Sequence, residues 1–391
     1  MKNNPSVLLL GGHENTLAVA RSLGDLGITV SVSTHRKSSI HYSRFCRKLY
    51  SVAAGEDLSV YWKKLLLEEP PLALKGNVIL CCSDDAVEFV AVHHHELNAR
   101  YVLEENLPQL QLALLDKYQT FLLAQKAGID VPRCWYGIEG DPFYRGVDIE
   151  FPVLVKPIIS HLYRRVFSFK LLLVETREQM EAHLREVHEH TLEVMLTEYV
   201  PGPDSLLCSY YTYVDKKGEC LFDFTKRVIR RFPKGFGSGC YHITEWLPDV
   251  AEIGRRFFRE IGYRGLGNVE FKRDLRDNKL KLIECNPRFT GAHELLVRSG
   301  MSTDKIVYSR LTHSPYKIPD SFKQFERLLY PWNDFNAYLE RRKQGEIDLC
   351  GWMRSLMHIQ NFPFFRLTDP LPALSQLFRL LRGIAKRRLH S

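Results

Sequence analysis

The pattern of apolar and polar positions changes twice along the chain. Over roughly the first hundred residues, short apolar runs such as "SVLLLGG" (6–12) and "ITVSVST" (28–34) alternate with amphipathic stretches such as "ENTLAVARSLGDLG" (14–27). Strand patterns that alternate with helical patterns are typical of a parallel, doubly wound sheet. We therefore expect a domain built on a parallel, doubly wound sheet over residues 1–112.

The next stretch, residues 113–315, mixes helices with strands that pair locally. "LLDKYQTFLLAQKAG" (114–128) predicts a helix that ends at its glycine. "FPVLVKPIIS" (151–160) is a short apolar run that carries one lysine, which must either extend to solvent or meet an anion. Residues 316–391 are aromatic, basic and broken by prolines, and predict a mainly helical C-terminal segment.

A hairpin is predicted over residues 268–286, "NVEFKRDLRDNKLKLIECN", because the polar "LRDN" separates two alternating apolar runs. If the turn is symmetric about Asp277, Glu270 lies opposite Glu284 and Asn268 lies opposite Asn286. Directly opposed acids destabilise a strand pair unless something positive lies between them. Magnesium would resolve the repulsion, since it takes oxygen ligands and is usually held by one or two carboxylates plus a substrate's phosphates.

Alternation along the second strand predicts that Leu282, Glu284 and Asn286 share one face, so that two oxygen donors point the same way. A plainer alternative also fits the sequence. In that alternative, Lys272 and Arg288 neutralise the acids on a solvated face without any metal.

Composition is that of an ordinary globular protein of more than one domain: 391 residues, 45% hydrophobic and 26% charged. The nine cysteines are scattered, which argues against a disulfide scaffold or a zinc site. The apolar runs are too short to span a membrane, and the chain begins with a strand pattern instead of a signal peptide. We expect a cytoplasmic protein.

The formal net charge of +8 is concentrated in two stretches, "KRVIRRFPK" (226–234) and the tail "FRLLRGIAKRRLHS" (378–391). No recognisable nucleic-acid module accompanies them, so we expect no nucleic-acid partner. Lys226, Arg227 and Arg230 on one strand predict an anion site for phosphate or carboxylate, with an exposed basic strand as the alternative. The amphipathic tail is compatible with contact to a membrane surface or a partner enzyme, or with a solvated terminal helix.

Strand ends of the first domain supply the candidates for substrate binding. The "GGH" turn (11–13) lacks the GxGxxG spacing, and the second strand does not end in an acid, which excludes dinucleotide binding there. Ligands of open sheets collect at the carboxyl ends of strands. For the two aspartates in this set, capping of a helix is an equally good explanation. The candidates are His13, Glu14, Asp84 and Asp85.

Five short motifs occur in one order along the chain: "LDK", "VLVKP", "EYVPG", "NVEF" and "ECNPR". This series resembles the ATP-grasp superfamily, in particular its carboligase-like, carboxylate-amine ligase branch related to biotin carboxylase and carbamoyl-phosphate synthetase. The resemblance extends to about residue 315. It implies two α+β subdomains (113–315) that clamp ATP, behind the Rossmann-like α/β domain and ahead of the helical segment 316–391.

The resemblance also implies roles for individual residues. Lys117 and Lys156 would contact the phosphates of ATP. Glu198, Tyr199 and Val200 would read adenine, with Glu198 accepting from its amino group, and Asp204 would hold the ribose. The metal ligands would be Glu270, Glu284 and Asn286. Arg288 would neutralise the γ-phosphate or an acyl phosphate, and Lys226 and Arg230 would assist it in catalysis.

The activity implied is ATP-dependent ligation, in which a carboxylate is activated as an acyl phosphate with release of ADP and is then joined to an amine or similar nucleophile. The implied cofactors are ATP and Mg²⁺, with Mn²⁺ as the alternative metal; the partners are small carboxylates and amines, and a homodimer is compatible with the family. Two alternatives stay open: a bicarbonate-using carboxylase with a partner protein, and a non-catalytic ATP-binding regulator.

One departure from the family pattern concerns the cover over the phosphates. Many ATP-grasp enzymes place a glycine-rich loop after the strand lysine. Here the loop is "PIISHLYRRVFSFK" (157–170), without a glycine. Side chains of Arg164, Arg165 and Lys170, or the backbone of "GFGSG" (235–239), are the candidates to replace it.

Overall fold

The computed structural model describes residues 4–35, 38–53, 55–136 and 148–389, with the side chains of the last seven of these left out. The chain forms two compact units. The first consists of Met1–Pro108, Arg288–Pro331 and Leu356–Ser391, and the second of Gln109–Pro287 and Trp332–Ser355. The C-terminal stretch that the sequence presents as one segment thus divides between the units.

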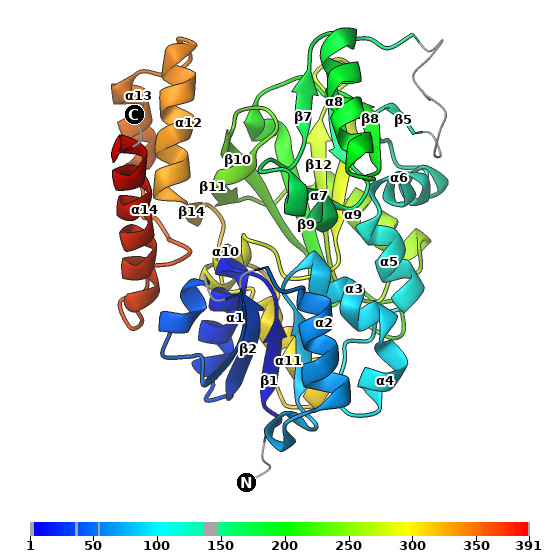
Figure 1. Ribbon diagram of the computed structural model, residues 1–391, viewed down its shortest axis with the longest axis vertical. Helices are drawn as coiled ribbons and strands as arrows, with labels where there is room; N and C mark the ends of the chain where they lie inside the picture. The colour runs from blue at the N-terminus through cyan, green and yellow to red at the C-terminus, as the bar shows by residue number, and fades with distance from the viewer. Residues whose placement is uncertain (1–3, 36–37, 54, 137–147, 390–391) are drawn as a thin grey trace. The chain divides into compact units, whose positions relative to one another are not determined.

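The first unit contains a four-stranded parallel sheet with the order β3-β2-β1-β4 (Figure 1). All four residues of β1, and of β4 at the edge of the sheet, are buried, as expected for parallel strands covered on both faces. The predicted Rossmann-like arrangement is confirmed. The strands are β1 (Val7–Leu10), β2 (Val30–His35), β3 (Lys48–Val52) and β4 (Val78–Cys81). The helices in this part are α1 (Glu14–Gly24), α2 (Leu58–Lys63), α3 (Asp84–Val92) and α4 (His94–Asn98).

Later parts of the chain complete the first unit. Two helices, α10 (His293–Arg298) and α11 (Thr303–Thr312), pack against α1. Asn15 of α1 donates from its side-chain amide to the carbonyl oxygens of Cys82 (2.7 Å) and Phe289 (2.7 Å), so one side chain links the end of β4 to the returning chain. The unit also contains β14 (Arg327–Leu329) and the last helix, α14 (Leu371–Leu389).

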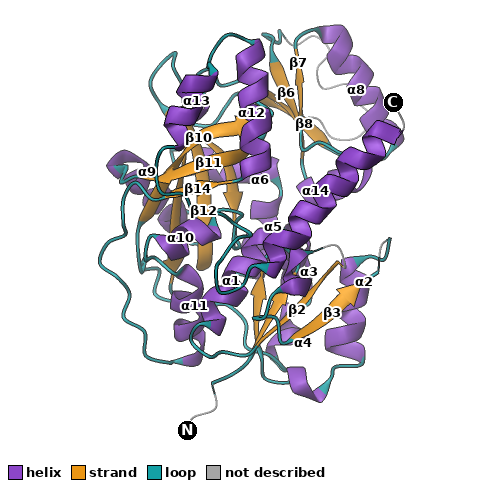
Figure 2. Cartoon of the chain, turned by 90° about the vertical axis from the view of Figure 1, so that its left-hand side faces the viewer, coloured by secondary structure: helices purple, strands orange, loops and turns teal. Residues whose placement is uncertain are grey.

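The second unit contains two antiparallel sheets (Figure 2). The smaller has the order β5-β8-β6-β7, and the larger contains, in order, β13-β12-β9-β10-β11 of this unit. The smaller sheet is built from β5 (Cys134–Trp135), β6 (Val153–Pro157), β7 (Leu172–Val174) and β8 (Val194–Glu198). The larger is built from β9 (Leu207–Val214), β10 (Phe224–Phe232), β11 (Ser238–Thr244), β12 (Gly265–Arg273) and β13 (Leu280–Asn286).

In the second unit, a helix that the sequence predicts as one piece divides into two. The single helix expected over residues 114–128 is interrupted at Asp116, whose carboxylate accepts from the backbone N–H of Gln119 (2.9 Å) and caps the second part. This cap places Lys117 at the first helical position. The helices are α5 (Pro108–Leu115), α6 (Lys117–Lys126), α7 (Ser160–Val166), α8 (Arg177–Glu189), α9 (Pro248–Glu260), α12 (Pro331–Lys343) and α13 (Leu349–Leu356).

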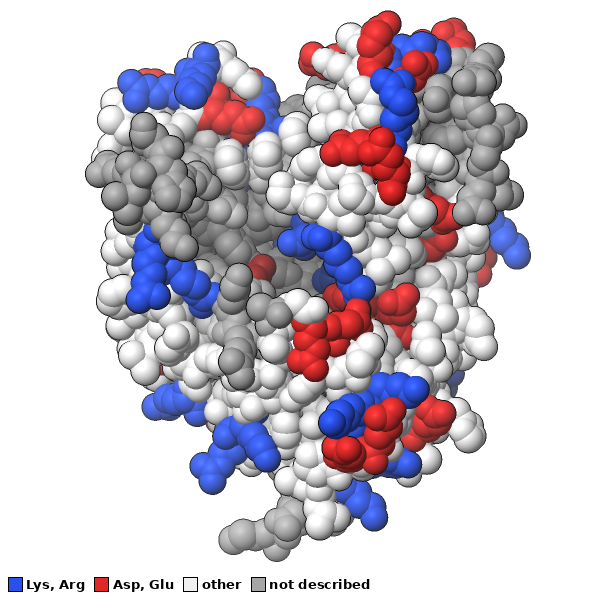
Figure 3. All heavy atoms as spheres, viewed as in Figure 1, with Lys and Arg blue, Asp and Glu red and all other residues white. Residues whose placement is uncertain are grey.

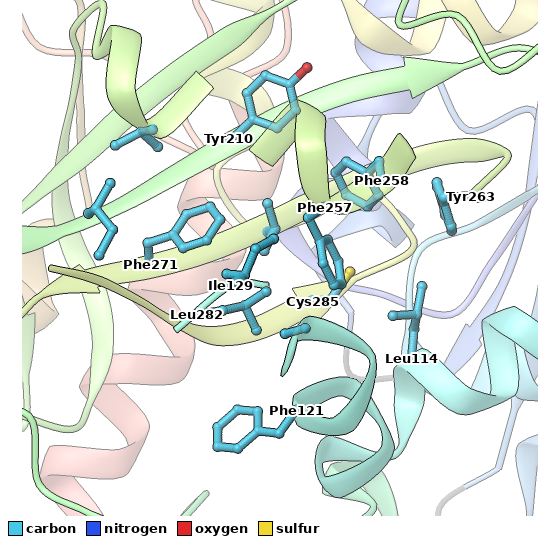
Figure 4. Close-up of a cluster of buried hydrophobic side chains, with 14 of the residues drawn as sticks. Leu114, Phe121, Ile129, Tyr210, Phe257, Phe258, Tyr263, Phe271, Leu282 and Cys285 are labelled. Carbon is cyan, nitrogen blue, oxygen red and sulfur yellow. The ribbon is translucent and has the colours of Figure 1, made fainter. Parts of the chain in front are cut away.

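One face of each sheet of the second unit is packed with apolar side chains. On the larger sheet the packed face, called here the core face, carries Tyr210, Phe271, Leu282 and Cys285 and meets Phe257 of α9 (Figure 4). The smaller sheet buries a separate cluster against α7 and α8. The two opposite faces are therefore the ones that remain available for functional side chains.

The surface of the described residues carries ion pairs at several places. Figure 3 shows basic and acidic side chains grouped together at several places on the surface that it draws. Lys64 and Glu69, for example, lie 3.8 Å apart. Within the described part of the chain, none of the helices combines the length and hydropathy that a membrane crossing requires.

Candidate functional site

The predicted register of the hairpin is confirmed at its open end. Glu270 lies opposite Glu284, and Asn268 lies opposite Asn286, on the antiparallel pair β12 and β13. The side-chain amide of Asn286 donates to Asn268 Oδ1 (3.1 Å), and Asn268 Nδ2 in turn donates to the backbone carbonyl of Tyr210 (3.1 Å). The amide of Asn286 is thereby held in a fixed orientation next to the opposed acids.

A β-bulge corrects one expectation about this hairpin. Phe271 pairs with Leu282 and not with Ile283, so Ile283 is an extra residue on β13. Leu282 therefore lies on the core face together with Cys285, three residues on, and not with Glu284 as strict alternation predicted. Without the bulge, a turn of this length would not bring Glu284 opposite Glu270.

The face of the larger sheet opposite the core face is called here the polar face; it carries Ser209, Tyr211, Lys226, Glu270 and Glu284. Lys226 is buried, and its ammonium group donates to Ser209 Oγ (3.0 Å). Burial raises the pKa of the Glu270 carboxyl; the charge of Lys226 opposes this, and the nearby Glu284 raises the pKa further. The lysine and the two acids thus form one interacting set of charges.

Two lysines from outside the larger sheet join this set. Lys117, at the start of α6, has its ammonium nitrogen 3.9 Å from Glu284 Oε1 and donates to Ser160 Oγ. Lys156 on β6 is 4% exposed, and burial lowers its pKa to about 8, with a partly compensating attraction from Glu284. It belongs to the face of the smaller sheet opposite that sheet's apolar cluster, because the cluster contains Val153 and Val155 but not the alternate positions.

The basic strand β10 differs from its sequence pattern for the same reason as β13. Val228 pairs with His242 and Arg230 pairs with Tyr241, which leaves Ile229 as an extra residue on β10. Side chains beyond the bulge exchange faces. As a result Arg231, and not Arg230, shares the polar face with Lys226.

Arg230, expected at an anion site, is paired within the protein. Its guanidinium makes two hydrogen bonds to the Asp334 carboxylate, at 2.6 Å and 3.0 Å, and a third to Ser355 Oγ (2.9 Å). Asp334 lies on α12 and is 1% exposed. The side chain of Arg230 therefore attaches α12 to the back of β10. Arg227 likewise pairs with Glu245.

Arg231 was not singled out from the sequence, yet it lies among the lysines of the site. Its Nε donates to Asp204 Oδ1 (2.9 Å), and its backbone N–H donates to Asp204 Oδ2 (3.0 Å). Its Nη2 is buried and has no hydrogen-bond partner among the described residues. The charge of Arg231 also contributes to lowering the pKa of Lys156 and of Lys272. Arg231 is therefore electrostatically coupled to both lysines.

Asp204, expected to hold a ribose, is occupied by protein donors. Besides Arg231 it accepts from the backbone N–H of Gly235 (3.2 Å) and from the guanidinium of Arg341. It is 6% exposed. Its carboxylate therefore positions Arg231 and is not available to a ligand in this arrangement.

Glu198, expected to accept from adenine, is also committed elsewhere. Oε1 accepts from Lys281 Nζ (2.6 Å) and from the backbone N–H of Arg133 (3.0 Å), and Oε2 accepts from Arg276 Nη2 (2.9 Å). Burial opposes ionisation of Glu198, but hydrogen bonds from these donors hold its pKa below the usual range. The carboxylate thus links the end of β8 to the hairpin.

The next two residues, Tyr199 and Val200, lie beside Lys272. Lys272 Nζ donates to the carbonyl oxygen of Val200 (2.7 Å) and lies 5.1 Å from the ring centroid of Tyr199. Burial, with help from Arg231, lowers the pKa of Lys272 to about 8. Lys272 therefore hydrogen-bonds to the chain after β8. The metal-free alternative requires Lys272 and Arg288 to neutralise the two acids, so this contact weakens that alternative.

Arg288, only two residues after Asn286, belongs to the first unit. Its Nε donates to Asp84 Oδ1 at the start of α3. The cap of that helix is Ser83, whose hydroxyl accepts from Ala86 N–H, so neither Asp84 nor Asp85 acts as the cap. Another candidate pair lies in the same unit: His13 Nδ1 is 3.2 Å from Glu14 Oε2.

The glycine-poor segment after Lys156 forms the short helix α7. Arg164 and Arg165 on it are exposed. Lys170, which follows α7, is also exposed, and its charge partly opposes the rise in the pKa of Glu270. Of the three side chains proposed to replace a glycine-rich loop, Lys170 is the one whose charge acts on the polar face.

The donor set on the polar face limits the kind of metal site that the unit can form. Among the described residues, no group of three or more His, Cys, Asp or Glu side chains could hold a metal ion. Two carboxylates and an amide are instead the set that suits a hard cation completed by water and phosphate oxygens.

Comparison with known proteins finds solved structures that superpose on this chain. No protein-family model matches the sequence, and no curated protein matches it either. Among solved structures, an L-amino acid ligase from Bacillus licheniformis superposes with a TM-score of 0.60 at 14% identity, over 84% of this chain and 79% of the ligase. An N5-carboxyaminoimidazole synthetase from Staphylococcus aureus, complexed with ADP, gives 0.60 at 15%, over 84% and 82%.

A third solved structure is the biotin carboxylase domain of a 2-oxoglutarate carboxylase from Hydrogenobacter thermophilus, in complex with magnesium ADP and bicarbonate. It gives a TM-score of 0.61 at 16% identity, over 82% of this chain and 73% of that one. These proteins share one architecture with the chain described here. The chain therefore has the ATP-grasp fold, as the motif series indicated.

Proposed function

We propose that this chain, given its ATP-grasp fold, is an ATP-dependent ligase that activates a carboxylate as an acyl phosphate, releases ADP and joins the acyl group to an amine or similar nucleophile. The observation that carries the proposal is the pair of opposed acids Glu270 and Glu284, surrounded by the buried ammonium groups of Lys156 and Lys226. Opposed acids and buried cations lower the stability of a protein that binds no ligand there. The same groups can bind a metal and polyphosphate.

The residues present fit a nucleotide. A buried donor without an acceptor, such as Arg231 Nη2, costs free energy until an oxygen reaches it. Lys156, with its lowered pKa, likewise gains from a nearby anion. We assign Lys117, Lys156 and Arg231 to the phosphates of ATP. The backbone of Tyr199 and Val200 would read adenine, while the Glu198 carboxylate keeps its structural partners.

The residues present also fit a divalent cation. Glu270, Glu284 and Asn286 would hold Mg²⁺, with Mn²⁺ as the alternative. When bound, the metal supplies neutralisation of the phosphate charge and a fixed orientation for the phosphates. Lys226, held by Ser209, would keep Glu270 ionised so that the site is ready for the metal.

The reaction proceeds by two displacements. An oxygen of the substrate carboxylate forms a bond to the γ-phosphorus as the bond from that phosphorus to the ADP oxygen breaks. The amine nitrogen then bonds to the acyl carbon, phosphate leaves with the C–O bond electrons, and the amine loses a proton. Such steps depend on positioning and charge neutralisation more than on acid or base catalysis. We assign Arg288 to the charge that develops on the transferred phosphoryl group.

The names of the structural neighbours suggest the range of acids to test. One is an amino acid ligase, and one was solved with bicarbonate. Bicarbonate therefore belongs in the screen beside organic acids, and a response to bicarbonate alone would favour the carboxylase alternative.

The test is phosphate release from ATP and Mg²⁺ with pools of carboxylic acids and amines, with ADP and the ligated product identified by mass spectrometry. The informative variant is Glu284→Gln, which removes a metal ligand and changes little volume. The matched control is Glu252→Gln, an exposed glutamate on α9. We expect release that requires both an acid and an amine, is lost in Glu284→Gln and is unchanged in Glu252→Gln.

Two results would contradict the proposal. Release that persists in Glu284→Gln at the wild-type rate would mean that the opposed acids do not serve the reaction. Magnesium-dependent ATP binding without turnover on any pool would instead favour a regulatory ATP-binding protein.

A further inference from the structure

The last helix, α14, packs with its polar side against residues Ser39–Tyr42 of the first unit. Its contacts converge on Ser39, in the turn Ser39–Tyr42. Ser375 Oγ donates to Ser39 Oγ (3.2 Å), and so do Gln376 Nε2 (2.7 Å) and Arg379 Nη2 (2.6 Å). Ser375 is buried by this contact. The side of α14 that meets the protein is thus made of hydroxyl, amide and guanidinium groups.

The opposite side of α14 is apolar and faces solvent. At 3.6 residues per turn its large side chains fall within an arc of about 120°. Amphipathic helices of globular proteins normally bury such a stripe against the core. Here the orientation is reversed, so the stripe lacks a partner among the described residues. The stripe consists of Leu371 (55% exposed), Leu374 (48%), Leu377 (51%), Phe378 (64%) and Leu381 (52%).

This orientation is fixed by a buried anchor just before the helix. Arg21 of α1, fully buried, donates from Nε to Asp369 Oδ2 (2.9 Å) and from Nη2 to the Asp369 carbonyl (2.8 Å). Ser43 Oγ donates to the same carboxylate oxygen (2.7 Å). Because breaking a buried ion pair is costly, the start of α14 is held in place. The exposed stripe is therefore a built feature of the unit and not the side of a loose tail.

The charge of this region indicates what covers the stripe. After Asp369 the sequence contains no Asp or Glu. A second copy of the chain would bring two such basic segments together, and that is unfavourable for a dimer through this helix. A segment that combines an apolar stripe of Leu and Phe with several Lys and Arg residues is typical of helices that lie on anionic lipid. The basic residues of the segment are Arg379, Arg382, Lys386, Arg387 and Arg388.

We propose that α14 docks the first unit onto an anionic lipid surface, with Leu374, Phe378 and Leu381 entering the acyl boundary and Arg382 contacting headgroups. The helix lies in the plane of the surface, which matches its length and its one-sided stripe. This attachment goes beyond ligation and does not depend on it, because the polar face of the second unit takes no part.

The experiment is flotation of the full chain with vesicles of phosphatidylcholine and phosphatidylglycerol, beside vesicles of phosphatidylcholine alone. The test variant is Leu374→Asp with Phe378→Asp. The control is Leu72→Asp, which alters an 89% exposed leucine elsewhere in the same unit. We expect the wild type and the control to float with the mixed vesicles and the test variant to bind at least about tenfold more weakly, as loss of two buried apolar side chains requires.

Further measurements distinguish a lipid surface from a second copy of the chain as the partner of the stripe on α14. Circular dichroism checks that the test variant is folded, and added salt should weaken binding, since exposed charges are screened. Absence of wild-type binding to mixed vesicles, or equal binding to phosphatidylcholine alone, overturns the proposal. So does a dimer in sedimentation that the test variant dissociates, which would assign the stripe to a second copy.

Discussion

Replacement of Lys156 by methionine should make the protein more stable while weakening nucleotide binding. Burial lowers the pKa of Lys156 from its ordinary 10.5 to about 8. At roughly 1.4 kcal/mol for each tenfold change in proton affinity, this difference corresponds to about 3 kcal/mol that the folded protein gives up to keep the ammonium charged. The side chain is 4% exposed, so solvent screening does not reduce the figure. Methionine has similar length and no charge, and it adapts to irregular space.

The sign of the pH dependence follows from the direction of the shift. Below about pH 8 the ammonium is protonated in both the folded and the unfolded chain, and the whole cost is present. Between about pH 8 and pH 10.5 the folded chain loses the proton first, so the unfolded chain binds more protons and the stability of the wild type rises with pH. The advantage of Lys156→Met should therefore shrink over that range.

The assay is urea denaturation followed by tryptophan fluorescence, at about pH 7 and about pH 9.5. The control is Lys64→Met, whose side chain is 63% exposed, and whose free energy of unfolding should change by less than about 0.5 kcal/mol. Binding of magnesium ADP should weaken by at least about tenfold in Lys156→Met, because a charged phosphate contact is lost. A variant less stable than the wild type at neutral pH, or a gain that does not vary with pH, would refute the reasoning.

Three other outcomes are expected. Arg230→Met should lower the free energy of unfolding by about 3–5 kcal/mol by leaving Asp334 buried without its cation, yet leave ADP affinity unchanged; a loss of affinity would return Arg230 to the nucleotide site. Binding of metal-free ADP near pH 8 should take up protons as phosphate raises the pKa of Lys156, and calorimetry in buffers of different ionisation enthalpy measures this uptake. Gly12→Ala should lower the denaturation midpoint more than Gly27→Ala: both glycines have positive φ (73° and 75°), but a Cβ at Gly12 would lie 2.7 Å from a backbone oxygen whereas Gly27 adjoins open space.

Much of the fold and the centre of the candidate site could be read from local patterns. The parallel sheet follows from buried apolar runs that alternate with helices. The opposed acids Glu270 and Glu284 follow from turn-forming residues between two alternating strands. Both inferences need only interactions between residues that are near in sequence or that repeat with a fixed period.

Two expectations failed because a bulge inserts a residue without a signal in the sequence. Ile283 on β13 and Ile229 on β10 are ordinary strand residues, and neither carries the glycine that marks some bulges. Each insertion reverses the alternation beyond it. Leu282 consequently changed from the polar to the core face, and Arg231 took the place predicted for Arg230.

Glu198 and Asp204 have protein partners that the sequence could not indicate, for a different reason. Both acids are at the positions that the motif series gives them, but their hydrogen-bond partners come from other parts of the chain. Arg276 and Lys281 lie in the hairpin, and Arg341 lies in α12. A motif specifies where a carboxylate is, and the remainder of the fold decides whether its oxygens remain available.

The same criterion separates the basic residues of β10. Arg227 and Arg230 face dedicated carboxylates, Glu245 and Asp334, that satisfy their charge within the protein. Arg231 has its Nε held by Asp204 but keeps Nη2 buried and unpaired. A guanidinium fixed at one edge and unsatisfied at the other is oriented for an anion that the protein does not supply, because a buried donor without an acceptor is otherwise a net cost. The unpaired Nη2 of Arg231 thus indicates an anion site more specifically than the run of basic residues on β10 does.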